Sequence, residues 1–476
     1  MIRNKCIPLC TVFLCSLLLT GTLFARGGQE EAPAPPETDA ATIQTEAPSP
    51  AQDAELLPMD PAVSSGRLAN GLSFYLRPNS EPENRVFLRL VVNAGSILET
   101  EEELGIAHFV EHAAFLGTEA YDQDQIVRYL ESIGMRFGPN VNAYTSFDET
   151  VYMLQIPADD PEKLERGIHI LQQWASAVSF EPQRIETERG VIQEEWRVGL
   201  GASQRFLDKQ FPILFKDSRY ADRLPIGNPE VFMNATHEDL RDFYERWYRP
   251  DLMSVMAVGD FEPSEMEALI TEYFGRIPAE KNPTERPLYP VAEHEETLFA
   301  PFSDPEAGNT WISIYNKQPP QPLRTKSEYR KQLEHRVFAD IMNTRFEELS
   351  RRPDAPFMAA GAAHGSLVRT SYAAIMQAVT EENRIHDGFE ALLTEAIRAR
   401  THGFSEAEVE RGRRRLHRQM QSAYNERNNT PSSAYTTEYT RHFLEGEAIP
   451  GIEYEWELTR ELLPQISVDD INKLAQ

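Results

Sequence analysis

Two histidines and a glutamate lie within one five-residue segment, His108-Phe109-Val110-Glu111-His112. His108 and His112 are four residues apart, so on a helix their imidazoles project from one face at the separation that two ligands of one metal ion need. Glu111, three residues after His108, borders the same face. This HxxEH arrangement, the inverse of HExxH, predicts a catalytic metal site.

A catalytic zinc site needs a third protein ligand and an open position for water. Acidic candidates lie in the later segment ERGVIQEEW. Glu188 and Glu195 are seven residues apart, about two helical turns, and therefore share nearly one face, whereas Glu194 is rotated away by about 100°. Spacing alone does not choose between Glu188 and Glu195.

A buried helix is expected to carry the two histidines. The segment GIAHFVEHAAFLGT has helical spacing and ends near Gly117, and the next amphipathic segment stops at Gly134. Two β-rich segments, residues 70–78 and 85–95, precede these helices. A turn-like SEPEN separates them, which predicts a hairpin. Further elements predicted in the first part of the chain are a β segment ending at Pro157, helices over 163–178 and 182–200, a helix capped by Thr236 and a strand over Leu252–Gly259.

These elements predict an α+β fold, because helices and strands are mixed without regular βαβ alternation. A second region repeats the order of the first, with strand-like WISIYNKQP and SYAAIMQAVT around a long amphipathic helix, which indicates an internal duplication. We expect two related domains, each a mainly antiparallel sheet covered by helices, with the second lacking its last strand. The predicted boundaries are 65–278 for the catalytic domain, 279–290 for a Pro-rich linker and 291–476 for a non-catalytic domain.

The first 25 residues resemble an export signal: Arg3 and Lys5 precede an uncharged apolar run. We favour a cleaved signal peptide over a retained membrane anchor. The three cysteines all lie inside this segment, so the mature protein would have neither disulfides nor a cysteine metal site. Residues 26–64, rich in Pro, Ala and acidic residues, predict a disordered tether, with a possible attachment to the membrane. The expected location is the periplasm or cell envelope.

The charge balance excludes one class of partner. The chain has 47 Lys and Arg against 75 Asp and Glu, a formal net charge of −28. Such a field repels a phosphate backbone, so we expect no nucleic-acid partner.

The segments HFVEHAAFLGT, NAYTSFDETVY, ERGVIQEEW and IGNPE followed by LRDFYERWYRPDLMSVMAVGDF together resemble the pitrilysin/insulinase family of inverted-zincin metallopeptidases. The resemblance covers about residues 65–275. It implies one Zn²⁺ per chain, held by His108, His112 and Glu195, with Glu111 as general base and Glu188 as a supporting acidic residue. The implied activity is that of a zinc endopeptidase.

The same resemblance implies a binding strand for substrate. Asn142, Ala143, Tyr144 and Thr145 correspond to an edge strand beside the metal, to which an extended peptide adds as a further strand. Backbone pairing of this kind selects extended or unfolded peptides rather than particular residues.

Family members enclose substrate between two halves, and this chain has room for one. We therefore expect a homodimer or a second peptidase-like subunit. Two other classes of function stay open: a non-catalytic or partner-dependent half of a two-part peptidase, and a structural or storage metal site in which His169 or His237 supplies a fourth ligand.

Overall fold

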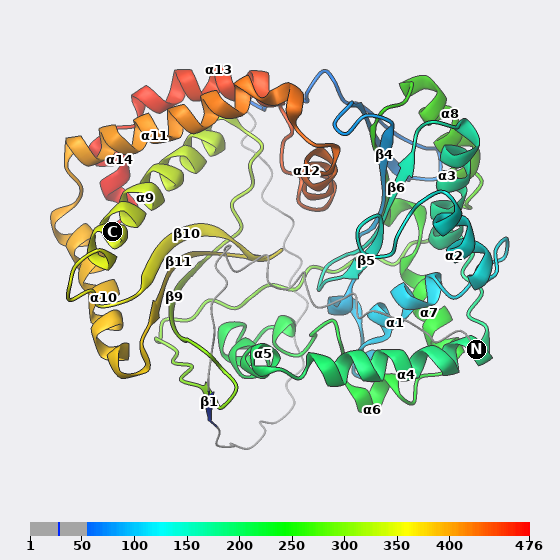
Figure 1. The fold of residues 1–476 in the computed structure, drawn as a ribbon, viewed down its shortest axis with the longest axis horizontal. Helices are drawn as coiled ribbons and strands as arrows, with labels where there is room; N and C mark the ends of the chain where they lie inside the picture. Colours follow the sequence, from blue (N-terminus) through cyan, green and yellow to red (C-terminus); the bar gives the residue numbers. More distant parts are fainter. Residues whose placement is uncertain (1–26, 29–54) are drawn as a thin grey trace.

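The computed structural model describes residues 27–28 and 55–476 (Figure 1). The predicted signal segment, residues 1–25, and most of the predicted tether lie outside the described residues. Among the helices that are described, none combines the length and the apolar character needed to cross a bilayer.

The first domain is built on a six-stranded sheet with the strand order β2-β3-β7-β4-β6-β5. Neighbouring strands are antiparallel except β3 and β7, which are parallel. The strands are β2 (Ser64–Arg67), β3 (Ser73–Pro78), β4 (Arg85–Val92), β5 (Val141–Thr145), β6 (Thr150–Pro157) and β7 (Met253–Gly259). The helices are α1 (Ile106–Ala114), α2 (Gln123–Ser132), α3 (Pro161–Ser176), α4 (Pro182–Gly199), α5 (Ala202–Leu214), α6 (Pro229–Phe232), α7 (His237–Trp247) and α8 (Pro263–Phe274).

The predicted hairpin between residues 70–78 and 85–95 is wrong. Both strands are present, as β3 and β4, but β7 lies between them and pairs with each. All seven residues of β7 are buried, as expected for a central strand whose sheet is covered on both faces. Local patterning predicts strands, whereas their pairing depends on which apolar strand of the whole chain fills the centre of the sheet.

The second domain is built on a three-stranded antiparallel sheet with the order β10-β11-β9. Its strands are β9 (Thr310–Gln318), β10 (Ala359–Val368) and β11 (Ser371–Thr380). Its helices are α9 (Lys326–Ser350), α10 (Ile385–His402), α11 (Glu406–Asn425), α12 (Ser432–Glu445), α13 (Ile452–Leu462) and α14 (Val468–Lys473). The pair β1 (Gly27–Gly28) and β8 (Ser303–Asp304) forms a separate short sheet. β10 is not predicted from the sequence, because its alanines and glycines carry little β pattern.

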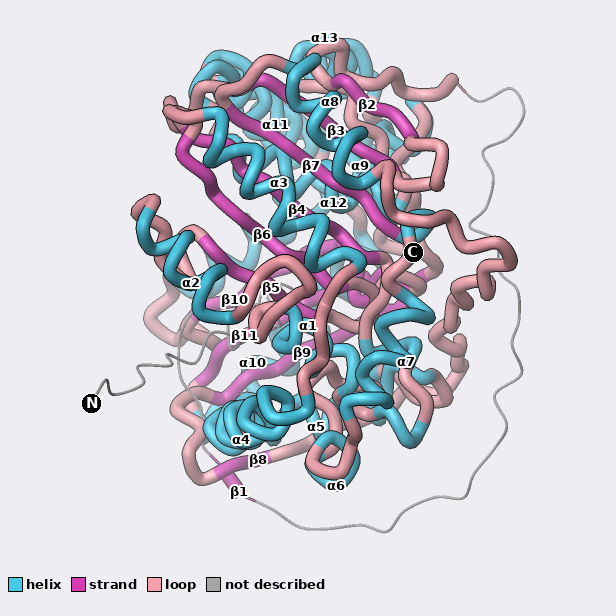
Figure 2. Tube along the Cα trace, turned by 90° about the vertical axis from the view of Figure 1, so that its right-hand side faces the viewer, coloured by secondary structure: helices cyan, strands magenta, loops and turns pink. Residues whose placement is uncertain are grey.

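The two sheets lie side by side with most helices on their outer faces (Figures 1 and 2). Each domain also places one helix against the inner face of the other domain's sheet. Tyr439 of α12 packs with Val91 and Met256 of the first sheet. In return, Lys317 of β9 donates a hydrogen bond to the Leu214 carbonyl at the end of α5, 2.8 Å away. This exchange ties the two domains together.

The domains are related by an internal repeat that extends to strand register. In the first sheet Leu88 pairs with Leu154, and in the second Ile312 pairs with Ala378. Both residue numbers are 224 higher in the second pair, so β9 and β11 are the counterparts of β4 and β6. The predicted α+β fold of two related domains is therefore confirmed.

Residues 55–64 are part of the folded body, although they fall in the predicted tether. Leu57 is buried in the core of the second domain, and its amide donates a hydrogen bond to the Arg324 carbonyl at 2.8 Å. Asp60 is also buried and forms an ion pair with Arg77 of the first sheet. The Pro and acidic content of this segment predicts a tether. Its few apolar side chains are nevertheless sufficient for it to pack against the folded domains.

Candidate active site

Helix α1 carries the first three candidate residues, and a buried carboxylate fixes its start. Gly105 occupies the N-cap position at φ 98°, a left-handed conformation that favours glycine. The two carboxylate oxygens of Glu99 accept hydrogen bonds from the amides of Gly105 and Ala107, at 3.0 and 2.8 Å. These bonds satisfy two of the free N–H groups at the helix start and so hold α1 in place.

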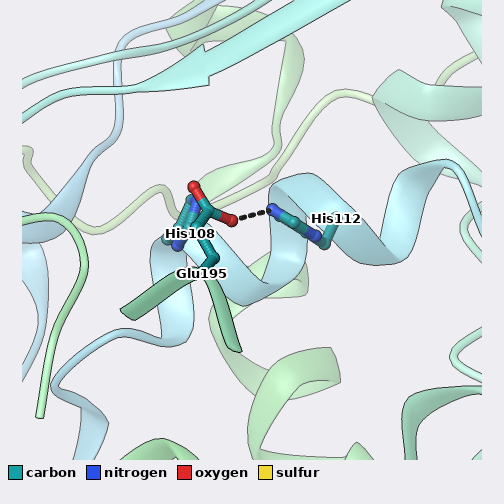
Figure 3. Close-up of side chains that lie close together, drawn as sticks. All are labelled: His108, His112 and Glu195. Atoms are coloured by element: carbon teal, nitrogen blue, oxygen red, sulfur yellow. Dashed lines mark ion pairs between the residues drawn. The ribbon is translucent and has the colours of Figure 1, made fainter. Parts of the chain in front are cut away.

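His108, His112 and Glu195 converge on one point (Figure 3). Nε2 of His108 lies 4.0 Å from Oε1 of Glu195, and Nε2 of His112 lies 3.4 Å from Oε2 of the same carboxylate. The histidines come from adjacent turns of α1, and Glu195 comes from α4, which packs beside it. The structure thus brings together the pair of histidines and the later of the two glutamates that spacing left open.

Glu188, two turns before Glu195 on α4, contacts the other ring nitrogen of His112. Its Oε1 lies 2.8 Å from Nδ1 of His112. An Nδ1–H donated to this carboxylate leaves Nε2 with its lone pair facing His108 and Glu195. Glu188 therefore orients His112 rather than joining the cluster of three.

Glu111 is buried beside the cluster. The hydroxyl of Thr145 donates a hydrogen bond of 2.9 Å to its Oε2. Burial raises the pKa of the Glu111 carboxyl to about 7, against the opposing effects of His112 and this hydrogen bond. Burial, and then the neighbouring His112, lower the pKa of His108 to about 4, so its imidazole is neutral at neutral pH.

The predicted substrate strand is β5, the edge strand of the first sheet. Its residues alternate between two faces. Ala143 lies in the core on the α1 side, and Thr145 reaches Glu111 on that same side. Tyr144 points the other way, into the cluster formed with α12, and Asn142 accepts a hydrogen bond from the Ala143 amide at 2.9 Å.

The cluster fits a zinc ion. Two imidazoles and one carboxylate are a ligand set typical of catalytic zinc, and their ligand atoms lie within 4.8 Å of one another. In the described part of the chain no other group of three or more His, Cys, Asp or Glu side chains is placed to hold a metal. His108, His112 and Glu195 would hold the ion.

His169 and His237, the two candidates for a fourth metal ligand, lie outside the cluster. Nδ1 of His169 is 2.7 Å from the Tyr121 hydroxyl, and His237 contacts Glu238 at the start of α7. Neither belongs to the cluster of three. A structural site closed by either histidine is therefore not supported.

A buried charge network, which sequence reasoning missed, links the turn between β5 and β6 to the interdomain segment and to the second domain. The turn between β5 and β6 carries Asp148, whose Oδ1 accepts a hydrogen bond of 2.8 Å from Arg286 of the interdomain segment. Arg369, in the turn between β10 and β11 of the second domain, contacts Glu149 at 3.2 Å and also reaches Asn93. No sequence signal predicts this network, because its members are far apart in the chain and each resembles an ordinary surface charge.

Two family models match the chain, one within the first domain and one that begins before α7 of the first domain and continues into the second. The family described as "Insulinase (Peptidase family M16)" matches residues 75–205, and the family described as "Peptidase M16 inactive domain" matches residues 234–416. The first match contains the cluster of three, and the second contains most of the second domain.

Three relatives are informative. A "Zinc protease PQQL-like" protein of Arabidopsis thaliana is 38% identical over 412 residues, which are 86% of this chain and 40% of that protein. The crystal structure of the first half of the periplasmic protease PqqL from Escherichia coli matches with a TM-score of 0.81 at 28% identity, covering 88% of this chain and 90% of that one. The ferredoxin protease FusC, in complex with Arabidopsis ferredoxin, matches with a TM-score of 0.73 at 25% identity, covering 88% of this chain and 46% of that one. The chain thus spans less than half the length of these whole proteases.

Proposed function

The chain belongs to the insulinase (M16) family of peptidases, and from that premise we propose that it is a zinc-dependent endopeptidase acting on extended or unfolded polypeptides in the cell envelope. One observation carries the proposal: a three-ligand cluster, His108, His112 and Glu195, lies beside the buried carboxylate of Glu111. A purely structural site does not need a base next to the metal.

The residues around the cluster have separate roles in the proposed hydrolysis. When bound, zinc supplies Lewis acidity, which polarises a peptide carbonyl and lowers the pKa of water. Glu111 accepts a proton from the attacking water at its carboxylate and returns it to the leaving amine. Because Thr145 donates to Oε2, it holds the carboxylate in one orientation and leaves Oε1 for the water. Burial raises the pKa of the Glu111 carboxyl in the metal-free site, and the charge of a bound zinc ion would lower it and so favour the carboxylate that accepts the proton.

The edge position of β5 supports an extended polypeptide as substrate. A peptide that adds to β5 as a further strand would pass Thr145, whose hydroxyl contacts the proposed base. The relative FusC was solved with a protein, ferredoxin, which agrees with a polypeptide substrate.

We further propose that the enzyme works with a second peptidase-like half and is exported. The length of the relatives supports the second half, since this chain covers 40% of the Arabidopsis protein and 46% of FusC. The charged start and apolar run of residues 1–25 support export to the periplasm, where the Escherichia coli relative is located.

The test is hydrolysis of a quenched library of unstructured peptides by the purified chain, with zinc content measured in parallel. Glu111→Gln is expected to lower kcat/KM by about 10³-fold while zinc stays at one ion per chain. Glu194→Gln is the matched control, because Glu194 lies on α4 next to Glu195 but pairs with Arg197 at the surface. It should retain full activity.

The outcomes are separable. Bound zinc without hydrolysis would contradict activity of this chain alone. Absence of zinc would contradict the site itself.

A further inference from the structure

Two equivalent hairpin turns, one from each domain, meet between the domains. In the first domain residues 146–149 join β5 to β6, and in the second Arg369 and Thr370 join β10 to β11. Because β11 is the counterpart of β6 and each of these strands pairs with an edge strand, the two turns occupy equivalent places. The first turn contains Asp148 and Glu149, and the second contains Arg369, so their charges are opposite.

The guanidinium group of Arg369 reaches the first turn at two points. Its Nη2 lies 3.2 Å from Oε2 of Glu149 and 3.4 Å from the carbonyl oxygen of Asp148, and its Nη1 donates to the side chain of Asn93. Asp148 has a second guanidinium partner, Arg286, at 2.8 Å. Among the described residues the one ion pair of Glu149 is with Arg369, and these two side chains are only 10% and 19% exposed. A pair so little exposed is weakly screened by salt.

The turn between β5 and β6 is packed closely against the end of β4. The Ser146 amide donates a hydrogen bond of 2.8 Å to the Glu149 carbonyl and so closes the turn. The Ser146 carbonyl accepts from the Ser96 amide at 3.1 Å. A Cβ on Gly95 would lie 2.3 Å from that same carbonyl oxygen, so only glycine allows this approach. In packing this close, a shift of the turn is passed on to its neighbours.

Thr145, which contacts the proposed base, directly precedes this turn. It is the last residue of β5, and its hydroxyl donates a hydrogen bond of 2.9 Å to Oε2 of Glu111. β5 is an edge strand, and backbone pairing joins it to β6 alone. The position of Thr145 therefore depends on the turn more than the position of a residue in a central strand would.

We propose that Arg369, a residue of the second domain, is a positioning residue for the peptidase site of the first domain. It holds the β5–β6 turn through Glu149 and the Asp148 backbone, and thereby keeps the Thr145 hydroxyl within hydrogen-bond distance of Glu111. The proposal rests on the proposed peptidase function. It gives the second domain, which matches a family described as inactive, a part in the reaction.

Two other roles for Arg369 make different predictions. The residue also borders a large groove lined by side chains of both domains, so it could instead contact substrate. Loss of a substrate contact would raise KM. Alternatively, Arg369 could stabilise the fold alone, in which case any equally stabilising ion pair of the second domain would matter as much for kcat.

The first test measures kinetics on unstructured peptides. Arg369→Met should lower kcat by about tenfold, because a small displacement of a catalytic group is costly, with KM and zinc content unchanged. Arg345→Met is the matched control. Arg345 of α9 is also 10% exposed and pairs with Glu408 at 2.8 Å inside the second domain. It should lose comparable stability in urea but retain the kcat of the parent chain.

A double variant tests the route through Thr145. If Arg369 acts through the Thr145 hydroxyl, Thr145→Val combined with Arg369→Met should have the kcat of Thr145→Val alone. Losses that multiply would overturn the proposal. So would a raised KM with unchanged kcat, or an equal loss of kcat in Arg345→Met.

Hydrogen exchange followed by mass spectrometry gives a readout that needs neither zinc nor hydrolysis. Amides in residues 95–99 and 141–149 should exchange about tenfold faster or more in Arg369→Met, and at the parent rate in Arg345→Met. Unchanged exchange in Arg369→Met would overturn the proposal. Bound zinc without hydrolysis would count against the proposed enzyme instead, so the two failures are distinguishable.

Discussion

The helix–strand pair that carries the candidate active site has a counterpart in the second domain. Thr145 of β5 pairs with Thr150 of β6, and His364 of β10 pairs with Ala374 of β11. Ala374 is 224 residues after Thr150, the offset of the repeat, so His364 stands where Thr145 stands. In each domain this strand residue contacts a helix: Thr145 bonds Glu111, and His364 stacks on His335 with ring centroids 3.9 Å apart.

The chemistry of the two pairs differs although their placement agrees. With the same offset His335 takes the place of Glu111, and Gln332 and Arg336 take the places of His108 and His112, the two proposed zinc ligands. Neither residue type is a usual zinc ligand. The fold therefore determines that a helix side chain meets the strand at this point, and the residue types alone determine whether a metal site results.

The largest expected effect comes from removing the proposed ligand His108. Removal of its counterpart in the second domain, Gln332, is the comparison. His108→Ala should lose bound zinc and lower peptidase activity by about 10³-fold or more, since the remaining ligands do not complete a catalytic site. Gln332→Ala should keep one zinc per chain and full activity. Zinc by mass spectrometry and hydrolysis rates measure both. Zinc retained by His108→Ala would mean that the metal is held elsewhere.

The next effect concerns the charge network that joins the domains. Burial alone would raise the pKa of Asp148, but Arg369 and Arg286 hold it below its usual value. Arg369→Met leaves buried carboxylates without this partner and should lower the free energy of unfolding by about 3 kcal/mol, measured by urea denaturation. Arg351→Met is the control: Arg351 is exposed and pairs with Glu347 on α9, so its loss should cost under about 0.5 kcal/mol.

Equal stability of these two variants would show that the second domain does not support the β5–β6 turn. In that case the contact of Arg369 with Glu149 would be incidental to the position of Thr145.

The local features of the site could be predicted from the sequence, and its long-range features could not. The spacing of His108 and His112 within one helix is sufficient to place both imidazoles on one face, because helical geometry is local. Choosing between Glu188 and Glu195 requires the relative position of α1 and α4, which is set by packing. The structure places Glu195 on the Nε2 side of His112 and Glu188 on its Nδ1 side, a distinction that no spacing rule contains.

The same contrast holds for the fold. The capping residue Thr236 and the strand that became β7 were predicted from local chemistry, and the capping box at Thr236 is present. The pairing of β3 with β4 was predicted wrongly, because the central position of β7 depends on the burial of an apolar strand from far along the chain.

A smaller effect is expected from the contact between Thr145 and the proposed base. Thr145→Val removes the hydroxyl that bonds Glu111 but keeps the shape of the side chain, and should lower kcat by about 10- to 100-fold with zinc unchanged. His364→Gln, at the equivalent strand position, should leave kcat unaltered. A matching loss in Thr145→Ser would argue against the hydrogen bond as the cause, since serine restores the hydroxyl.

The smallest expected effect is the contribution of His335, in the second domain, to the pH dependence of the free energy of unfolding. Burial, and then the neighbouring His364, lower the pKa of His335 to about 4, from a usual value of 6.5. Above pH 6.5 the imidazole is neutral in both folded and unfolded chains, so it adds no pH dependence. As the pH falls from 6.5 toward 4 the unfolded chain binds a proton that the folded chain does not, and the free energy of unfolding decreases. In urea denaturation, the free energy of unfolding should decrease less between pH 7.5 and pH 5 for His335→Gln than for the parent chain. His402→Gln, at an exposed position, should show the same decrease as the parent chain.

Repeating this measurement with and without zinc compares the histidines of the two domains directly. A bound ion would keep protons off His108 and so reduce the acid sensitivity contributed by the first domain. The contribution of His335 should be the same with and without zinc, because its helix and strand have the geometry of the first domain but not its ligands. A zinc-dependent contribution from His335 would show that the second domain also takes part in metal binding, and the separation of the two regions by residue type alone would fail.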